Sequence, residues 1–146
     1  MKFRRPATPD VRALCAAVRH SRKALCKRIA ETSDVPDESL AQAFAALVAA
    51  IEAGFCREEQ VMETLGMACL RDQRQNNALI LSALHHAAPA VESGDLALGR
   101  KVIAALRDLL DLHRLSADLV LAAGGRPPAF PPGAAWYGAS DYALAW

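Results

Sequence analysis

The stretch FAALVAAIEAGFCREEQVMETL, residues 44–65, decides the fold of this 146-residue chain. It contains no proline, and its large apolar residues recur at alternating spacings of three and four, which is the period of one face of an α-helix. The residues on that face are Phe44, Val48, Ile51, Phe55, Glu58, Met62 and Leu65. Only Glu58 is polar among them. The stretch therefore predicts a long core helix with one buried carboxylate.

Proline, glycine and helix-capping residues divide the chain on either side of this stretch. We predict four helices, near residues 9–31, 38–65, 69–90 and 95–123. The breaks that bound them are Thr8-Pro9-Asp10, Thr32–Asp37, Gly66, Ser93-Gly94-Asp95 and Gly124-Gly125. Because short connections join long helices, consecutive helices run antiparallel. The expected architecture is all-α, an up-down-up-down antiparallel four-helix bundle over residues 1–125.

The remaining residues, 126–146, differ in composition from the helical part. Four of the eight prolines lie in Arg126–Gly133, which predicts an extended segment. All the Trp and Tyr residues of the chain follow it, namely Trp136, Tyr137, Tyr142 and Trp146. Rings of this size bury a large apolar area, so we expect the Pro-rich aromatic tail to fold back over an apolar seam. The alternative is a docking segment for a second subunit, giving a homodimer, or for another partner.

Composition excludes several classes of protein. The chain has 31 Ala and 19 Leu, which favours helix, and 17 Lys+Arg against 16 Asp+Glu, for a net charge of +1. A near-neutral chain gives no reason to expect nucleic acid or an acidic membrane surface as a partner. No uninterrupted apolar run reaches the roughly 18 residues of a spanning helix, and no signal-peptide core is present. We therefore expect a cytoplasmic protein without a membrane partner.

The sequence also lacks the motifs of catalysis and of common metal sites. It has no phosphate-binding glycine loop, no nucleophile elbow and no HExxH, so we do not expect an enzyme. The four cysteines form no CxxC pair, which argues against a zinc or redox motif. We expect them to be small buried hydrophobes. They are Cys15, Cys26, Cys56 and Cys69.

Each of the other three helices also has a polar interruption in its apolar face. The interrupting residues are Arg22 in the first helix, Gln73 and Asn77 in the third, and His113 in the fourth. Burial of an unpaired polar group costs several kcal/mol, so these side chains should meet one another and Glu58 in one buried polar layer. The alternatives are that each lies at an exposed end or that the helical phase is wrong by one residue.

The position of Arg22 along its helix is the weak point of that layer. Counted from the turn between the first two helices, Arg22 lies nearer the turn than Glu58 does, at about 1.5 Å of rise per residue. The connection at Thr32–Asp37 must absorb this difference. His20 is the alternative residue from the first helix.

Four short motifs carry a resemblance to bacterial hemerythrin-like proteins, the HHE-type cation-binding four-helix bundles. Residues 54–62, GFCREEQVM, resemble the family's HFxxEExxM segment, with Gly54 in place of the histidine. Residues 66–77 resemble its GYPxxxxHxxxH stretch, with Gln73 and Asn77 in the histidine positions. Residues 109–118, LLDLHRLSAD, are similar to WLxxHIxxxD, and Arg22 replaces the histidine of HxxL. The resemblance covers roughly residues 10–123.

The resemblance implies a site at which five histidines and two bridging carboxylates would hold a di-iron centre that binds oxygen. This chain keeps the carboxylates as Glu58 and Asp118 and one histidine as His113. The other four positions hold Arg22, Gly54, Gln73 and Asn77. Glycine offers no ligand, amides are poor iron ligands, and the arginine guanidinium stays protonated. The metal site is therefore degenerate, and a di-iron centre is not expected.

Two functional hypotheses follow from this substitution pattern. The first is a non-catalytic bundle without a cofactor, in which Arg22 supplies the countercharge for Glu58 and Asp118 and the amides fill the volume of lost imidazoles. Such a bundle would be a regulatory, ligand-binding or protein-interaction module, with a protein or small ligand as its partner. The alternative is a reduced iron site on Glu58, His113 and Asp118, with Gln73 or Asn77 as a weak fourth contact, that binds or senses oxygen or nitric oxide.

Overall fold

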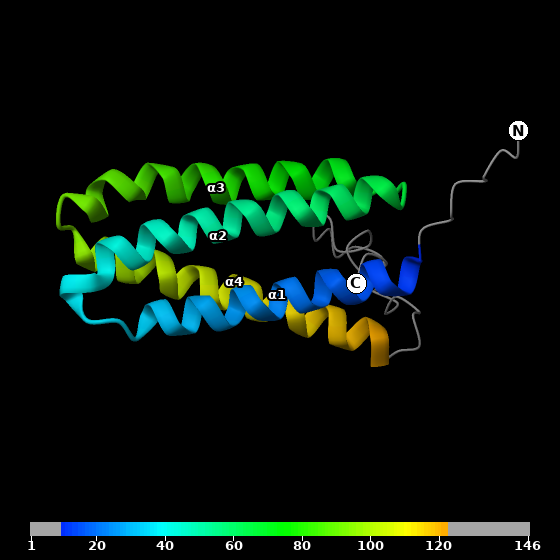
Figure 1. Ribbon diagram of the computed structural model, residues 1–146, viewed down its shortest axis with the longest axis horizontal. Helices are drawn as coiled ribbons and strands as arrows, with labels where there is room; N and C mark the ends of the chain where they lie inside the picture. Colours follow the sequence, from blue (N-terminus) through cyan, green and yellow to red (C-terminus); the bar gives the residue numbers. More distant parts are fainter. Residues whose placement is uncertain (1–9, 123–146) are drawn as a thin grey trace, which may run out of the picture.

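The computed structural model describes residues 10–122, and side chains for residues 10–111. The chain is all-α over this range: the helices are α1 Val11–Ser33, α2 Asp37–Thr64, α3 Leu70–Glu92 and α4 Leu96–Ala122 (Figure 1). All four predicted helices are present, with bounds within two residues of those expected. The Pro-rich aromatic tail, residues 126–146, lies outside the described residues, so its predicted packing stays a prediction.

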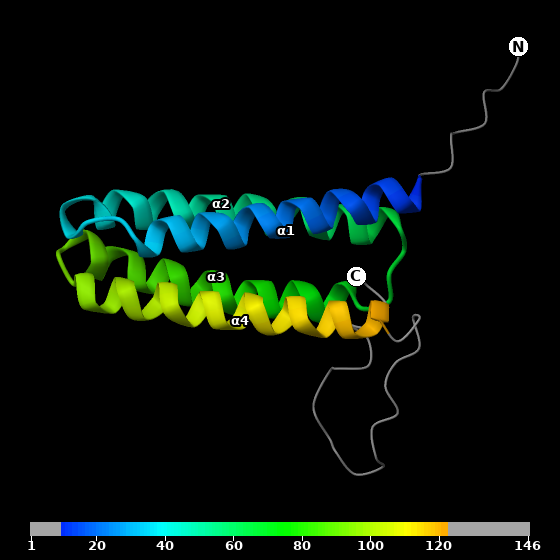
Figure 2. The ribbon, with the colours of Figure 1, turned by 90° about the horizontal axis from the view of Figure 1, so that it is seen from below.

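The four helices lie alongside one another in an elongated body (Figure 2). The α1–α2 and α3–α4 connections are at one end of that body, and the α2–α3 connection is at the other. Helix α2 packs against α1, α3 and α4, and α4 packs against α1 and α3. A side chain on the inner face of α2 can therefore be reached from three neighbouring helices.

The helix ends follow local chemistry, with one correction at the start. Asp10 is the N-cap of α1, because its Oδ1 accepts hydrogen bonds from the backbone N–H groups of Arg12 and Ala13 at 3.1 and 3.2 Å. Helix α1 therefore begins at Val11, two residues later than predicted, directly after its capping aspartate. Gly66 and Gly94 have φ of +64° and +104°, which L side chains rarely adopt, so they end α2 and α3 as predicted.

An apolar core fills the body near the α1–α2 and α3–α4 connections. We call this cluster the apolar half. Its buried members are Leu25, Ile29, Leu40, Phe44, Leu47, Val48, Ile51, Phe55, Leu84, Ala87, Val91, Ile103 and Leu106. They come from all four helices, so burial of these side chains is the main force that holds the helices together.

Arg100 of α4 holds the connection between α1 and α2. Its guanidinium donates to the backbone carbonyls of Ser33 and Val35, each at 2.9 Å, and to the Asp37 carboxylate at 2.6 Å. The connection runs on past the end of α1 before α2 begins (Figure 1). Arg100 thus satisfies carbonyls that the extended segment would otherwise leave without a protein donor.

Two further features of the helices bear on the expectations above. By length and composition, α2 is long and apolar enough to cross a membrane. It also has nine buried residues and contacts the other three helices, as a central core helix does.

Among the cysteines, Cys69 is buried, Cys15 and Cys26 are partly buried, and Cys56 is exposed. The expectation of burial is therefore wrong for Cys56, which lies on the outer side of α2.

Candidate functional site: a buried polar cluster

A close approach of α1 to α2 lies one helical turn from the site. A Cβ atom built on Gly54 would lie 2.8 Å from Cδ1 of Leu25, so the absence of a side chain at residue 54 lets the two helices approach here. Arg22 is one turn from Leu25 toward the N-terminus of α1, and it lies opposite Glu58, one turn from Gly54 toward the C-terminus of α2. The ion pair thus forms despite the difference in rise that the sequence indicates.

Arg22 and Glu58 form a two-point ion pair. Nε of Arg22 donates to Oε2 of Glu58 at 3.1 Å, and Nη2 donates to Oε1 at 2.5 Å. The Glu58 side chain is 5% exposed and that of Arg22 is 21% exposed. Such a fork matches the shape of a carboxylate and keeps the buried charge of Glu58 compensated. His20, the alternative helix-one residue, is exposed.

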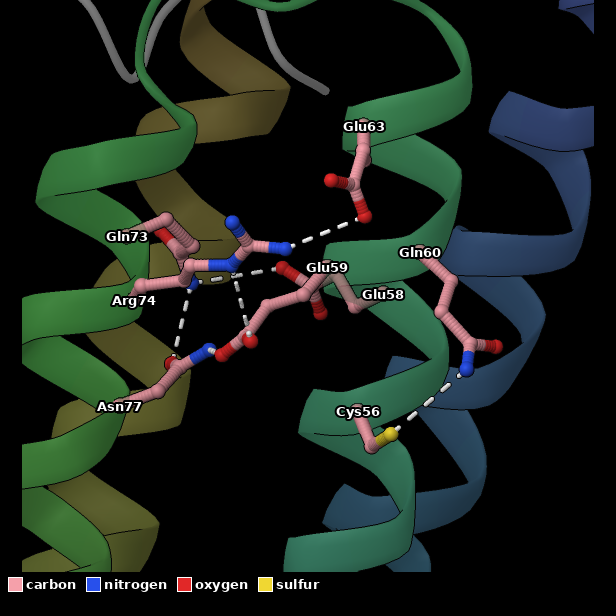
Figure 3. Close-up of polar contacts among 8 residues, drawn as sticks. All are labelled: Cys56, Glu58, Glu59, Gln60, Glu63, Gln73, Arg74 and Asn77. Atoms are coloured by element: carbon pink, nitrogen blue, oxygen red, sulfur yellow. Dashed lines mark hydrogen bonds and ion pairs between the residues drawn. The ribbon is translucent and has the colours of Figure 1, made fainter.

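Two buried amides of α3 complete the contacts of α2. Nε2 of Gln73 donates to Oε1 of Glu58 at 3.4 Å and to Oδ1 of Asn77 at 3.2 Å. Nδ2 of Asn77 donates to Oε1 of Glu59 at 2.8 Å (Figure 3). Gln73 and Asn77 are 5% and 2% exposed. We call Arg22, Glu58, Glu59, Gln73 and Asn77 the polar cluster.

The structure therefore brings together four of the six residues of the predicted polar layer: Arg22, Glu58, Gln73 and Asn77. The side chains of the other two, His113 and Asp118, lie outside the described residues. Sequence reasoning missed Glu59, which accepts from Asn77, and Arg74, which bridges Glu59 and Glu63 at 3.5 and 3.2 Å. Glu59 does not lie on the apolar face of α2. The available signal was its position beside Glu58, in reach of α3.

Burial and charge compete at Glu58. Desolvation is the largest influence and raises the pKa of Glu58 above its usual 4.5, because burial disfavours the ionised form. The hydrogen bonds and positive charge of Arg22 lower the pKa, and the neighbouring charge of Glu59 raises it. The net pKa of Glu58 is raised, because desolvation outweighs the effect of Arg22. Arg22 is therefore the group that favours the ionised form of this buried carboxyl.

A cavity of about 30 Å³ adjoins the polar cluster on the inner side. Its polar lining includes Arg22, Glu58, Gln73 and Asn77, and its apolar lining includes Leu25 and Phe55 of the apolar half. A space of this size, mostly apolar but bordered by the polar cluster, holds about one water molecule. This cavity has no room for an organic substrate, but a second, more open cavity of about 280 Å³ between α1 and α2 is also lined by Glu58, with Val18, Ser21 and Val61.

The described residues do not fit an iron centre. The guanidinium of Arg22 occupies both oxygens of Glu58, where a bridging carboxylate would face a metal cation. A Cβ atom at residue 54 would lie 2.8 Å from Cδ1 of Leu25, so a histidine there requires the Leu25 side chain to shift. Among the residues 10–111, no three His, Cys, Asp or Glu side chains gather into a candidate metal site. The reduced site on Glu58, His113 and Asp118 includes two side chains beyond that range.

None of the protein-family models, the curated proteins or the solved structures compared with this chain matches it. The fold and the cluster thus define the class on their own: an all-α protein of four packed helices with a charged and amide-lined interior.

Proposed function

We propose that this protein is a metal-independent, non-catalytic relative of the hemerythrin-like bundles that serves as a regulatory or protein-interaction module. The observation that carries the proposal is the fork of Arg22 on buried Glu58. A guanidinium bound at two points provides the positive charge that a metal would otherwise supply to this carboxylate. In this proposal the four helices form an up-down-up-down antiparallel bundle, which the positions of their connections support.

The other substitutions support the same interpretation. Gln73 and Asn77 stand at the two positions where the family has histidines, and both donate hydrogen bonds within the cluster. An amide donates to a carboxylate without needing to lose a proton, whereas a histidine ligand must present a lone pair. The cluster therefore satisfies its own polar groups: no buried side-chain N or O atom among the described residues lacks a partner.

The size of the interior favours binding at the surface over chemistry inside. The small cavity beside the cluster has room for about one water molecule, and the Glu58 carboxylate that lines it is already bound by Arg22. We infer a cytoplasmic module whose polar cluster fixes the relative positions of α1, α2 and α3. Its partners, whether proteins or small ligands, would contact the outer faces of the helices.

Thermal unfolding with and without metal tests the proposal. The melting temperature of the purified protein should be the same in EDTA and in anaerobic Fe²⁺, because nothing in the native state binds the ion. If the native state had an iron site, free Fe²⁺ at 100 times the Kd would add about 2.7 kcal/mol to the free energy of unfolding. The melting temperature would then rise by several degrees. A rise of that size with Fe²⁺, abolished by Glu58→Gln, would favour the alternative iron protein that binds oxygen or nitric oxide.

A converse experiment asks whether the lost ligands alone explain the lost metal. Arg22→His, Gly54→His, Gln73→His and Asn77→His restore the family's histidines, but the new side chain at residue 54 collides with Leu25. We therefore expect the fourfold variant to bind iron only when Leu25→Ala is added. Iron binding by the fourfold variant without that change would show that the approach of α1 to α2 adjusts freely.

A further inference from the structure

The positive charges of the chain are concentrated on α1. This helix carries six Lys or Arg residues and one acid, Glu31, so the rest of the chain is net negative. The whole-chain charge of +1 conceals this separation. Arg22 is the one basic residue of α1 that turns inward to an ion pair with a buried acid. The others are exposed.

Four of the exposed cations form a stripe along the outer face of α1. Their spacings of seven, four and four residues place them on one side of a helix. We call them the basic stripe: Arg12, Arg19, Lys23 and Lys27. At about 1.5 Å of rise per residue, the stripe is about 22 Å long. The only ion pair that the described residues make with it is Lys27–Glu31, at 3.7 Å between two exposed groups, which is weak.

We propose that the basic stripe docks the phosphate backbone of a double-stranded nucleic acid. Cationic side chains spaced along 22 Å match a linear anion with charges repeated along its length, and each contact releases counterions. The ten residues before α1 add Lys2, Arg4 and Arg5 against one acid, the N-cap Asp10, at the same end of the chain. A basic N-terminal segment followed by a basic helix is a common arrangement for nucleic-acid contact.

The chemistry of the stripe distinguishes a duplex from the two rival polyanions. Helix α1 has no Phe, Tyr or Trp on which single-stranded bases could stack, and its one imidazole, His20, is a smaller platform. An anionic membrane would favour several large apolar side chains beside the cations, whereas Val11 is the one large, exposed apolar residue of α1. The docking therefore reads phosphate and not base sequence.

Fluorescence anisotropy of the full chain with a labelled 24-base-pair DNA of arbitrary sequence tests the proposal, at about 50 mM salt and above. Four phosphate contacts predict a slope of log K against log salt of roughly −3.6. In the triple variant Arg12→Glu, Arg19→Glu, Lys23→Glu, affinity should fall about tenfold or more and the slope should flatten by about 2.7. The same titration with a duplex RNA of equal length shows whether the stripe binds DNA, RNA or both.

The matched control carries the same change of total charge away from α1. Arg71→Glu, Lys101→Glu and Arg107→Glu alter three exposed cations of α3 and α4, and affinity should change by less than about threefold. Circular dichroism checks that both variants are folded. Equal losses in the two variants, no duplex binding at 50 mM salt, or preferential binding to single strands or to phosphatidylserine vesicles would overturn the proposal.

Discussion

In the apolar half, thirteen buried hydrophobic residues fill the space between the helices, whereas the polar cluster fills the same kind of space with one ion pair and two amides. The first region depends on volume and shape, since dispersion and burial are not directional. The second depends on pairing, because each polar group is costly when it loses its partner. A single substitution should therefore destabilise either region, whereas in the polar cluster an apolar replacement of both partners should restore stability.

The largest effect is expected in the apolar half. Phe44 is 1% exposed at the centre of that cluster. Phe44→Ala should lower the free energy of unfolding by about 3–5 kcal/mol, because the cavity it leaves cannot fully collapse. Urea denaturation measures the change in the free energy of unfolding. Repeated at pH 5 and pH 7, it should give the same loss. A loss below about 1 kcal/mol would mean that the core is loosely packed.

A slightly smaller effect is expected in the polar cluster. Arg22→Ala leaves Glu58 buried without its cation, and the free energy of unfolding should fall by roughly 3 kcal/mol at pH 7, the low end for a buried pair because Arg22 is partly exposed. The paired change Arg22→Leu with Glu58→Leu should recover much of this loss. Failure of the pair to recover stability would show that Arg22 acts through packing and not through charge.

The same variant sharpens the comparison through its pH dependence. Burial raises the pKa of native Glu58 above 4.5, so the proton it binds stabilises the native state below that pH, and this contribution is lost as pH rises through the native pKa. Removal of Arg22 takes away the influence that lowers this pKa. The stability deficit of Arg22→Ala should therefore shrink as the pH falls from 7 to 5. A deficit that is constant with pH would contradict the role given to Glu58.

A smaller effect is expected at the end of the apolar half. Arg100→Ala removes the donors to the carbonyls of Ser33 and Val35 and should lower the free energy of unfolding by about 1–2 kcal/mol, since water can replace part of the contact. Arg107→Ala, an exposed arginine two turns along α4, is the matched control and should change stability by less than about 0.5 kcal/mol. Equal effects would remove any special role for Arg100.

Sequence reasoning found the parts of the fold and site that depend on local patterns. Helical periodicity and glycine stops located four helices, and the interruptions at Arg22, Glu58, Gln73 and Asn77 led to the cluster. The close contact of α1 with α2 at Gly54 and the hydrogen bonds of Arg100 to the α1–α2 connection depend on how distant segments meet. Helical periodicity does not encode such contacts. The basic stripe was visible in the sequence, but a sum over the whole chain conceals it.

Metal content tests the central claim, that the Arg22–Glu58 ion pair takes the place of a metal at this carboxylate. The most direct measurement is elemental analysis, with a visible spectrum, of the full chain purified from cells grown with added iron. We predict far less than one iron per chain and no visible absorption band, because Arg22 already neutralises Glu58. Iron at one or two equivalents per chain would contradict the central claim, since the Arg22 guanidinium and a metal cation would repel each other at the same carboxylate.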